Sequence, residues 1–226
     1  MRGMMNARKL ATKAREVISR MAKSDLGPYI DESLTPPTHF RGKGEIKLII
    51  LGQDPTVHDS DKRKNIKVTL LLNQPGSLRR YIEEICKGLD INLGKNIYAT
   101  NLLKNFFTIP PDIKRKEDPQ FLQKAAEYWI TLLKEEIEEF KNIPVLTLGE
   151  PVLNCLTKTH DEVLIRYSWG FEEPGQYGEK RGYINPPENV LNRIIFPFPH
   201  LPGLKHKIYK QQMDGYLKFI KKYINK

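Results

Sequence analysis

The feature that most constrains the fold is a series of four short apolar runs, each followed by turn-forming or polar residues and separated from the next by a helical segment. The runs cover residues 46–51, 96–100, 145–148 and 193–196. Short apolar runs of this kind are typical of strands that are buried on both faces of a sheet. Their alternation with helices predicts a single α/β domain with three α/β/α layers and a central, mostly parallel four-stranded sheet.

Apolar residues recur at helical spacing in the segments between these runs. The pattern predicts a first helix carrying Leu10 and Met21, a helix that begins at Ser77 as its N-cap, and a long helix that is capped by Asp118. Further helices are expected after Pro151 and from residue 209 to 223, a loop at residues 27–44, and an extended piece at residues 162–167. We therefore expect residues 1–44 to form a helix and loop packed on a domain of residues 45–226.

Polar residues that could bind a ligand or take part in a reaction follow the predicted strands. Gln53 and Asp54 follow the first run, Asn101 the second and His200 the fourth. Ligands bind at the carboxyl ends of the strands in parallel sheets, so these side chains are expected to gather at one edge. The carboxylate could hold a water, the amide could read the edge of a pyrimidine, and the histidine could donate to a carbonyl that gains negative charge. Each residue taken alone is equally consistent with a turn, a helix cap or a solvated loop.

The composition favours a polyanionic partner. The chain has 226 residues and a formal net charge of +10, which is typical of proteins that bind DNA or RNA but also of lysine-rich proteomes. Two cysteines are too few for a four-cysteine iron–sulfur site. No apolar run is long enough to span a bilayer, and the basic N-terminus lacks the apolar stretch of a signal peptide. We therefore expect a cytoplasmic monomer that does not contact membranes.

Five short segments carry a resemblance to a known family. Residues 52–55 (GQDP) match the start of a water-activating GQDPYH motif, and residues 100–104 (TNLLK) are similar to an asparagine motif of the form TNLVK. Residues 146–149 (LTLG) look like an LWG strand and turn, residues 75–78 (PGSL) like a PPSL segment, and residues 200–204 (HLPGL) like a closing loop of histidine, proline, serine and leucine. Together, in this order, they resemble the uracil-DNA glycosylase superfamily, over about residue 46 to the C-terminus.

The resemblance implies a uracil-DNA glycosylase-like fold and a base-excision activity. The target nucleotide would be flipped out of the duplex, and Asp54 would orient or activate a water against the sugar C1′. His200 would stabilise the departing uracil anion, Asn101 would read the uracil edge, and Gln53 would contribute mainly backbone contacts to the base. The family chemistry implies no metal and no organic cofactor.

The sequence departs from the family pattern around the base. Thr56 stands where the family has the tyrosine that excludes thymine, and Val57 replaces the histidine that follows it. The aromatic residue that stacks on uracil has no clear counterpart: Leu70 or a neighbour in residues 68–72 occupies its region, and Phe106 and Phe107 lie just past the asparagine motif. The resemblance therefore implies base contacts by Thr56 and Leu70, and leaves open which deaminated base is removed.

Contacts with DNA are expected from the remaining motifs. Ser77, Lys104 and Lys205 would hold phosphates, and Leu204 would fill the gap that the flipped base leaves in the stack. A competing register of the closing loop places Phe196 at the family histidine position and His200 at the wedge.

Two other functional classes remain open from the sequence. The first is a protein of the same fold that binds nucleic acid without catalysis, as the changes at Thr56 and in the closing loop could indicate. The second is a different α/β hydrolase or nucleotide-binding enzyme. Against this second class, the chain contains no GxGxxG, GxxxxGK[ST] or GxSxG motif.

Overall fold

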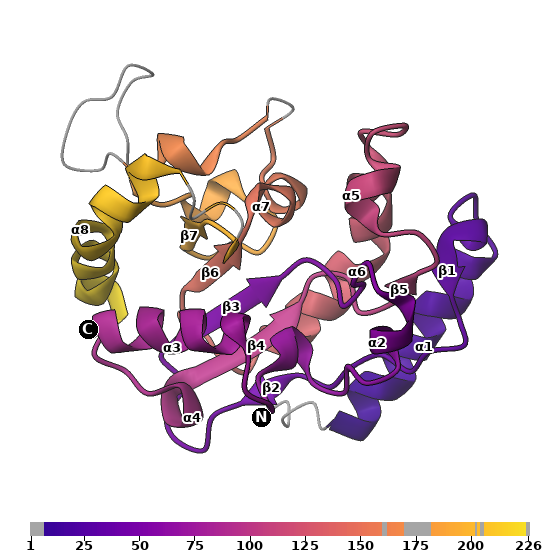
Figure 1. Cartoon of the computed structure of the whole chain (residues 1–226), viewed down its shortest axis with the longest axis horizontal. Coiled ribbons are helices and arrows are strands. Elements are labelled where there is room, and N and C mark those ends of the chain that lie inside the picture. The colour runs from indigo at the N-terminus through magenta and orange to yellow at the C-terminus, as the bar shows by residue number, and fades with distance from the viewer. Residues whose placement is uncertain (1–6, 160–161, 170–181, 202, 204–205, 225–226) are drawn as a thin grey trace.

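A computed structural model describes residues 7–159, 162–169, 182–201, 203 and 206–224 (Figure 1). Its longer helices are α1 (Ala7–Ala22), α3 (Ser77–Gly88), α6 (Phe121–Ile137), α7 (Glu150–Leu156) and α8 (Lys207–Ile224). Short helices are α2 (Ser60–Arg63), α4 (Leu93–Asn96) and α5 (Pro111–Lys114), and 3₁₀ turns are η1 (Gly27–Tyr29), η2 (Thr69–Leu71), η3 (Ile165–Tyr167) and η4 (Pro186–Glu188). Each predicted helix is present, although several ends differ.

The central sheet has five strands in the order β2-β4-β3-β6-β7. Its strands are β2 (Phe40–Arg41), β3 (Leu48–Gly52), β4 (Ile97–Asn101), β6 (Val145–Leu148) and β7 (Ile195–Phe198). The last four are the predicted strands and run parallel, whereas β2 pairs antiparallel with β4 at the edge. The prediction of four strands was therefore wrong by one. A strand of two residues is too short to show a hydrophobic period, so the sequence predicted only a loop there.

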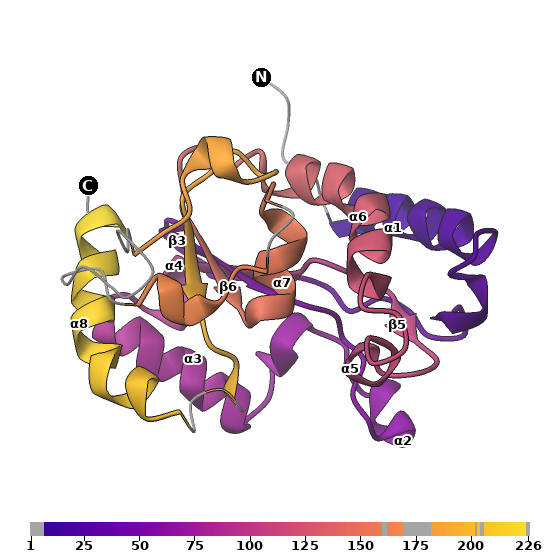
Figure 2. The same ribbon diagram turned by 90° about the horizontal axis from the view of Figure 1, so that it is seen from above.

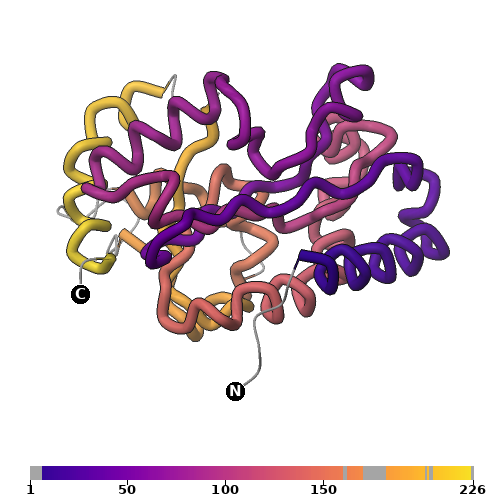
Figure 3. The backbone as a smooth tube through the Cα atoms, turned by 90° about the horizontal axis from the view of Figure 1, so that it is seen from below, coloured from indigo at the N-terminus to yellow at the C-terminus, as the bar shows by residue number. Residues whose placement is uncertain are grey.

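The N-terminal segment belongs to the same structural unit as the rest of the chain. Besides β2, it contributes β1 (Ile30–Asp31), which pairs antiparallel with β5 (Phe106–Phe107). Helix α1 packs on α6 and adds Leu10, Ala14 and Val17 to the main hydrophobic core. Figure 3 shows the chain after α1 crossing the molecule before it enters β3. No break in the sheet or the core accompanies the expected boundary at residue 44 in the described part of the chain.

Two helical layers cover the sheet, as predicted. Figure 2 shows α3 and α8 on one side and α6 with α1 on the other. Paired strands direct in-register side chains to the same face, and successive residues alternate between faces. Tyr98 and Thr100 of β4 face α6, where their hydroxyls meet Glu136 and Lys104. Asn101 consequently faces the α3 side.

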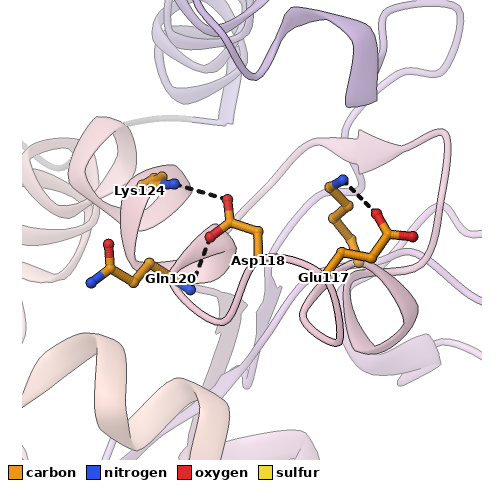
Figure 4. Close-up of polar contacts among 5 residues, drawn as sticks. Glu117, Asp118, Gln120 and Lys124 are labelled. Carbon is orange, nitrogen blue, oxygen red and sulfur yellow. Dashed lines mark hydrogen bonds and ion pairs between the residues drawn. The ribbon is translucent and has the colours of Figure 1, made fainter.

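The start of α6 differs from the prediction. Its N-cap is Gln120, which makes no side-chain capping bond. Asp118 instead accepts a hydrogen bond from the Gln120 N–H at 3.1 Å and contacts the Lys124 ammonium at 2.8 Å (Figure 4). A second ion pair joins Lys114 to Glu117 at 2.7 Å just before it. Asp118 thus stabilises the turn that leads into the helix rather than capping the helix itself.

Three further local predictions need correction. Ser77 is the first residue of α3, and the N-cap is Gly76. Residues 162–167 include the 3₁₀ turn η3 rather than a strand. Strand β7 begins two residues later than expected and includes Pro197, whose missing N–H is tolerated because β7 is an edge strand. Within the described residues, no helix has the length and apolar character needed to cross a bilayer.

Candidate functional site

The carboxyl ends of the parallel strands meet at one edge of the sheet, as the sequence predicted. Gly52 of β3 pairs in register with Asn101 of β4. The ladder continues past both strands, because Leu102 N–H donates to Gly52 O at 2.8 Å and Leu103 N–H donates to Gln53 O at 2.9 Å. Since neighbouring strands lie about 4.8 Å apart, the loop that carries Asp54 runs directly beside the segment that follows Asn101.

Asp54 is held by its own loop. One carboxylate oxygen accepts the Thr56 N–H at 2.7 Å, and the other accepts the Gln53 side-chain amide at 2.6 Å. Burial raises the pKa of Asp54 above its ordinary value, and the hydrogen bonds from Thr56 and Gln53 oppose this rise. The arrangement fixes the orientation of a partly buried carboxylate, whose raised pKa makes it a stronger base than an exposed aspartate.

Thr56 and Gln53 are thus placed to orient Asp54. The Thr56 hydroxyl also accepts the Phe107 N–H at 2.9 Å, which ties the loop to β5. Arg63 adds a second tie, since its guanidinium donates to Val57 O and to Phe107 O, each at 2.8 Å. The contacts of Thr56 and Gln53 with a base stay predictions, and their observed role is to hold the carboxylate.

Asn101 offers an unpartnered acceptor at the strand ends. The residue is 2% exposed, and its side-chain oxygen has no hydrogen-bond partner within the described protein. Buried polar atoms without a partner are rare and costly, so such an atom at a strand end is a candidate for ligand binding. The side chain lies over Gly52, because a Cβ built on Gly52 would be 2.6 Å from the Asn101 oxygen.

Leu70 closes the same space from η2. The same Cβ built on Gly52 would be 2.6 Å from Leu70 Cδ2, so Leu70 and Asn101 both approach the backbone of β3. Leu70 and Leu71 have φ of 56°, in the left-handed region that is unfavourable for leucine. Arg79 of α3 donates to Leu72 O at 2.9 Å and helps to hold this turn. The structure thus brings together Leu70 and Asn101, and the base contacts that the resemblance implied for them stay predictions.

We expect Gly52→Ala to disturb this arrangement. The added methyl group would overlap Asn101 Oδ1 and Leu70 Cδ2, and because both side-chain ends can turn away, the cost should lie near the lower end of the about 1–3 kcal/mol that overpacking causes. Urea denaturation should therefore show lower stability, and the affinity for any ligand of the site should fall. Gly76→Ala is a matched control, because a Cβ at Gly76 meets no atom within 4 Å. Equal ligand affinity of the two variants would contradict the close packing of Asn101 and Leu70 on Gly52.

His200 lies at the same edge but farther along the sheet. It follows β7, which is separated from β3 by β6, so about 10 Å lies between the ends of β3 and β7. Its Cβ is 3.6 Å from the Cβ position of Gly149, which follows β6. Tyr81 of α3 anchors this loop through a 2.7 Å hydrogen bond from its hydroxyl to Pro199 O. The His200 side chain is exposed, yet partial desolvation lowers its pKa, which favours the neutral imidazole.

The competing register of the closing loop does not fit the structure. Phe196 lies inside β7, is fully buried, and packs against Phe219 and Tyr223 of α8. A core residue of this kind cannot contact a ligand beyond the strand ends. Of the two residues, only His200 lies beyond the strand ends, and its contact with a base stays a prediction.

Lys104 does not fit its predicted role. Its ammonium lies 2.6 Å from a Glu136 carboxylate oxygen and donates to Thr100 Oγ1 at 2.7 Å and to Asn101 O at 3.0 Å. The residue is only 5% exposed. A buried ammonium with three protein partners cannot bind a DNA phosphate, so the predicted phosphate contact of Lys104 was wrong.

Of the other residues predicted to contact DNA, only Ser77 lies in the described part of the chain. Ser77 is exposed at the start of α3, beside the exposed Arg80, and its contact with phosphate stays a prediction. Leu204 and Lys205 lie outside the described residues, as does most of the segment 169–187.

Two residues near the site were not predicted from the sequence. Tyr81, which anchors the loop of His200, looks in sequence like any apolar residue of an amphipathic helix. Glu136 had a detectable signal, because it follows Trp129 by seven and Leu133 by three residues and so falls on the apolar face of α6. A charged residue at such a position indicates a buried partner.

Comparison with known proteins adds no family assignment to this geometry. Among the described residues, no group of three or more His, Cys, Asp or Glu side chains could hold a metal ion. No family model matches the chain, and a search of curated proteins finds no match.

Proposed function

We propose that this protein is a DNA glycosylase that removes uracil or a related deaminated base from DNA. One observation supports the proposal most directly. The oriented carboxylate of Asp54 and the amide oxygen of Asn101, which has no hydrogen-bond partner, follow the ends of two neighbouring strands. A carboxylate that activates water and an amide that recognises a base edge are the two groups that such a reaction requires. We also propose that the α/β domain has the uracil-DNA glycosylase-like fold, with β2 as an added edge strand.

The proposed reaction is hydrolysis of the N-glycosidic bond. A water held by Asp54 attacks C1′ of a flipped-out nucleotide, where oxocarbenium-like charge develops. The C1′–O bond forms, the bond from C1′ to the base breaks, and the base leaves with the bonding electrons as an anion that is later protonated. Asp54 takes up the proton of the water. The products are an abasic deoxyribose and the free base.

Asn101 would bind the base through its amide, with Leu70 forming one wall of the pocket. The free amide oxygen can accept the N–H of uracil, while the amide nitrogen can donate to the neighbouring carbonyl. His200 would donate a hydrogen bond to the departing base, and its lowered pKa suits a neutral donor. Its distance along the sheet requires the base to extend from β4 toward β7.

The positive charge of the chain supports a DNA partner, since cations bind phosphates and release counterions. Ser77 and Arg80 at the start of α3 are the exposed groups that we assign to phosphate contact. The binding of nucleic acid without catalysis is the alternative function, and the replacement of the family tyrosine by Thr56 is the feature that favours it.

The proposal predicts that the purified protein releases uracil from an oligonucleotide without added metal. A panel of labelled strands should contain uracil opposite guanine, uracil opposite adenine, single-stranded uracil, hypoxanthine, xanthine and thymine opposite guanine. Alkaline cleavage of abasic sites gives the readout, and the undamaged strand is the control. The strands with uracil are expected to react. Because Thr56 replaces the tyrosine that would exclude thymine, some release of thymine from the thymine–guanine strand is also expected.

Failure to form an abasic site from any strand of the panel would contradict the glycosylase proposal. Binding of the same strands, measured by fluorescence anisotropy, would then support the non-catalytic alternative.

A further inference from the structure

A buried polar cluster lies on the face of the sheet opposite Asn101. Glu136 of α6 is its centre, with one carboxylate oxygen 2.6 Å from Lys104 Nζ and the other accepting the Tyr98 hydroxyl at 2.8 Å. The side chains of Lys104 and Glu136 are 6% and 1% exposed. An ion pair so deeply buried seldom adds net stability, because both charges lose their hydration. Its presence here calls for a reason other than folding energy.

The cluster reaches the candidate site through the backbone. Lys104 Nζ donates to Asn101 O at 3.0 Å and to Thr100 Oγ1 at 2.7 Å, so the ammonium holds the last two residues of β4. It thereby closes the turn from residue 101 to residue 104 onto the strand. This turn also carries the two N–H groups, from Leu102 and Leu103, that extend the ladder to the Asp54 loop.

Helix α6 holds the same turn at a second point. Asn105, which follows Lys104, accepts the indole N–H of Trp129 at 3.0 Å with its side-chain oxygen. Trp129 and Glu136 are seven residues apart on one face of α6, and both are fully buried. The turn after β4 is thus attached to α6 at two successive residues, while the Asn101 side chain itself remains without a partner for its oxygen.

We propose that Lys104 and Glu136 are positioning residues for Asn101, which orient its amide for base recognition without touching the base. The proposal rests on the proposed function for the identity of the ligand, but the mechanical link does not depend on it. An amide that must match a base edge gains from a rigid backbone, since a misplacement of about 1 Å can cost about 100-fold in rate.

A double-mutant cycle tests this link. Lys104→Met should lower kcat/KM for uracil release by about 10- to 100-fold. If Lys104 acts through Asn101, adding Lys104→Met to Asn101→Ala should cause little further loss. Independent, multiplicative losses would overturn the proposal.

The paired variant Lys104→Met/Glu136→Leu, which leaves no buried charge in this ion pair, should show the same loss of kcat/KM and guards against misfolding. Tyr98→Phe is the matched control: it removes a bond to Glu136 but leaves the bonds of Lys104 to β4, so thermal stability should fall while kcat/KM stays within about twofold.

Hydrogen exchange supplies a readout that is independent of activity. In Lys104→Met, the amides of Leu102 and Leu103 should exchange faster than in the wild type and in Tyr98→Phe. Unchanged protection of these amides would overturn the positioning role, whatever the substrate. Faster exchange in a protein that releases no base would support the positioning role and count against the proposed function alone.

Discussion

Asp54→Asn should lower the rate of uracil release by about 10²- to 10⁴-fold, which is the usual contribution of a general base. Asparagine keeps the size of the side chain and can still accept the Thr56 N–H, but it cannot take a proton from water. Its amide nitrogen would also face the Gln53 amide, so Gln53 must turn its oxygen toward position 54. Single-turnover release from a uracil-containing strand is the measurement, and His200→Ala, which removes only a hydrogen-bond donor to the leaving base, should lose a smaller part of the rate.

The direction of the pKa shift of Asp54 determines how the reaction rate and the stability should depend on pH. Burial raises this pKa, so as the pH falls Asp54 is protonated, and its activity lost, at a higher pH than for an exposed aspartate. The rate should therefore begin to fall on the acid side at a correspondingly higher pH. The same shift means that ionised Asp54 destabilises the fold: the favourable contribution of the neutral form is present below the unfolded-state pKa and is lost as the pH rises through the folded-state pKa. At neutral pH, Asp54→Asn should therefore be no less stable than the wild type.

This combination separates chemistry from folding. Loss of activity with unchanged or higher stability in urea would support Asp54 as the base. Equal rates in the wild type and the variant would refute the mechanism, even in an active enzyme.

Glu136→Ala should have the largest effect on stability. The change leaves the buried Lys104 ammonium without its counter-charge and the Tyr98 hydroxyl without its acceptor. Breaking a buried ion pair by removing one partner costs about 3–5 kcal/mol. For a chain of this size each kcal/mol lowers Tm by about 2–4 °C, so a decrease of about 6–20 °C is expected in a thermal unfolding scan followed by circular dichroism.

Two other variants provide a graded control for this prediction. Tyr98→Phe removes only one hydrogen bond to a charged group, worth about 1.5–3 kcal/mol, and should fall between the wild type and Glu136→Ala. Lys124→Ala breaks an ion pair whose lysine side chain is about half exposed and should cost about 1 kcal/mol or less. A Tm for Glu136→Ala as high as that for Lys124→Ala would contradict the buried pair.

The predictions from sequence succeeded where a period or a chain order carries the information. Four parallel strands and the main helices follow from runs of apolar residues, because each pattern extends over enough residues to be distinguished. The placement of Asp54, Asn101 and His200 at one edge follows from the rule that parallel strands end together. The two-residue strands β1 and β2 leave no such pattern, and neither does the shift of β7 to residues 195–198.

The predictions failed where a side chain could turn to either of two faces. Lys104 was expected to face DNA, as a lysine after a strand usually faces solvent. The structure turns it inward, because Glu136 lies on the buried face of a helix that starts 17 residues later in the chain. Phe196 and His200 were both candidates for one role, and the observed end of β7 at Phe198 places only His200 beyond the sheet.

The sequence by itself determined the α/β class. It also determined which polar residues follow the parallel strands, and in what order along the chain. Only the tertiary structure decided which of these groups meet. It showed that Asn101 and Leu70 converge over Gly52, that Thr56 and Gln53 hold Asp54, and that Lys104 pairs with Glu136 beneath the strand. The reason is physical: periodicity and turn chemistry are local properties of the chain, whereas the partner of a buried polar atom is set by packing between segments that are distant in sequence.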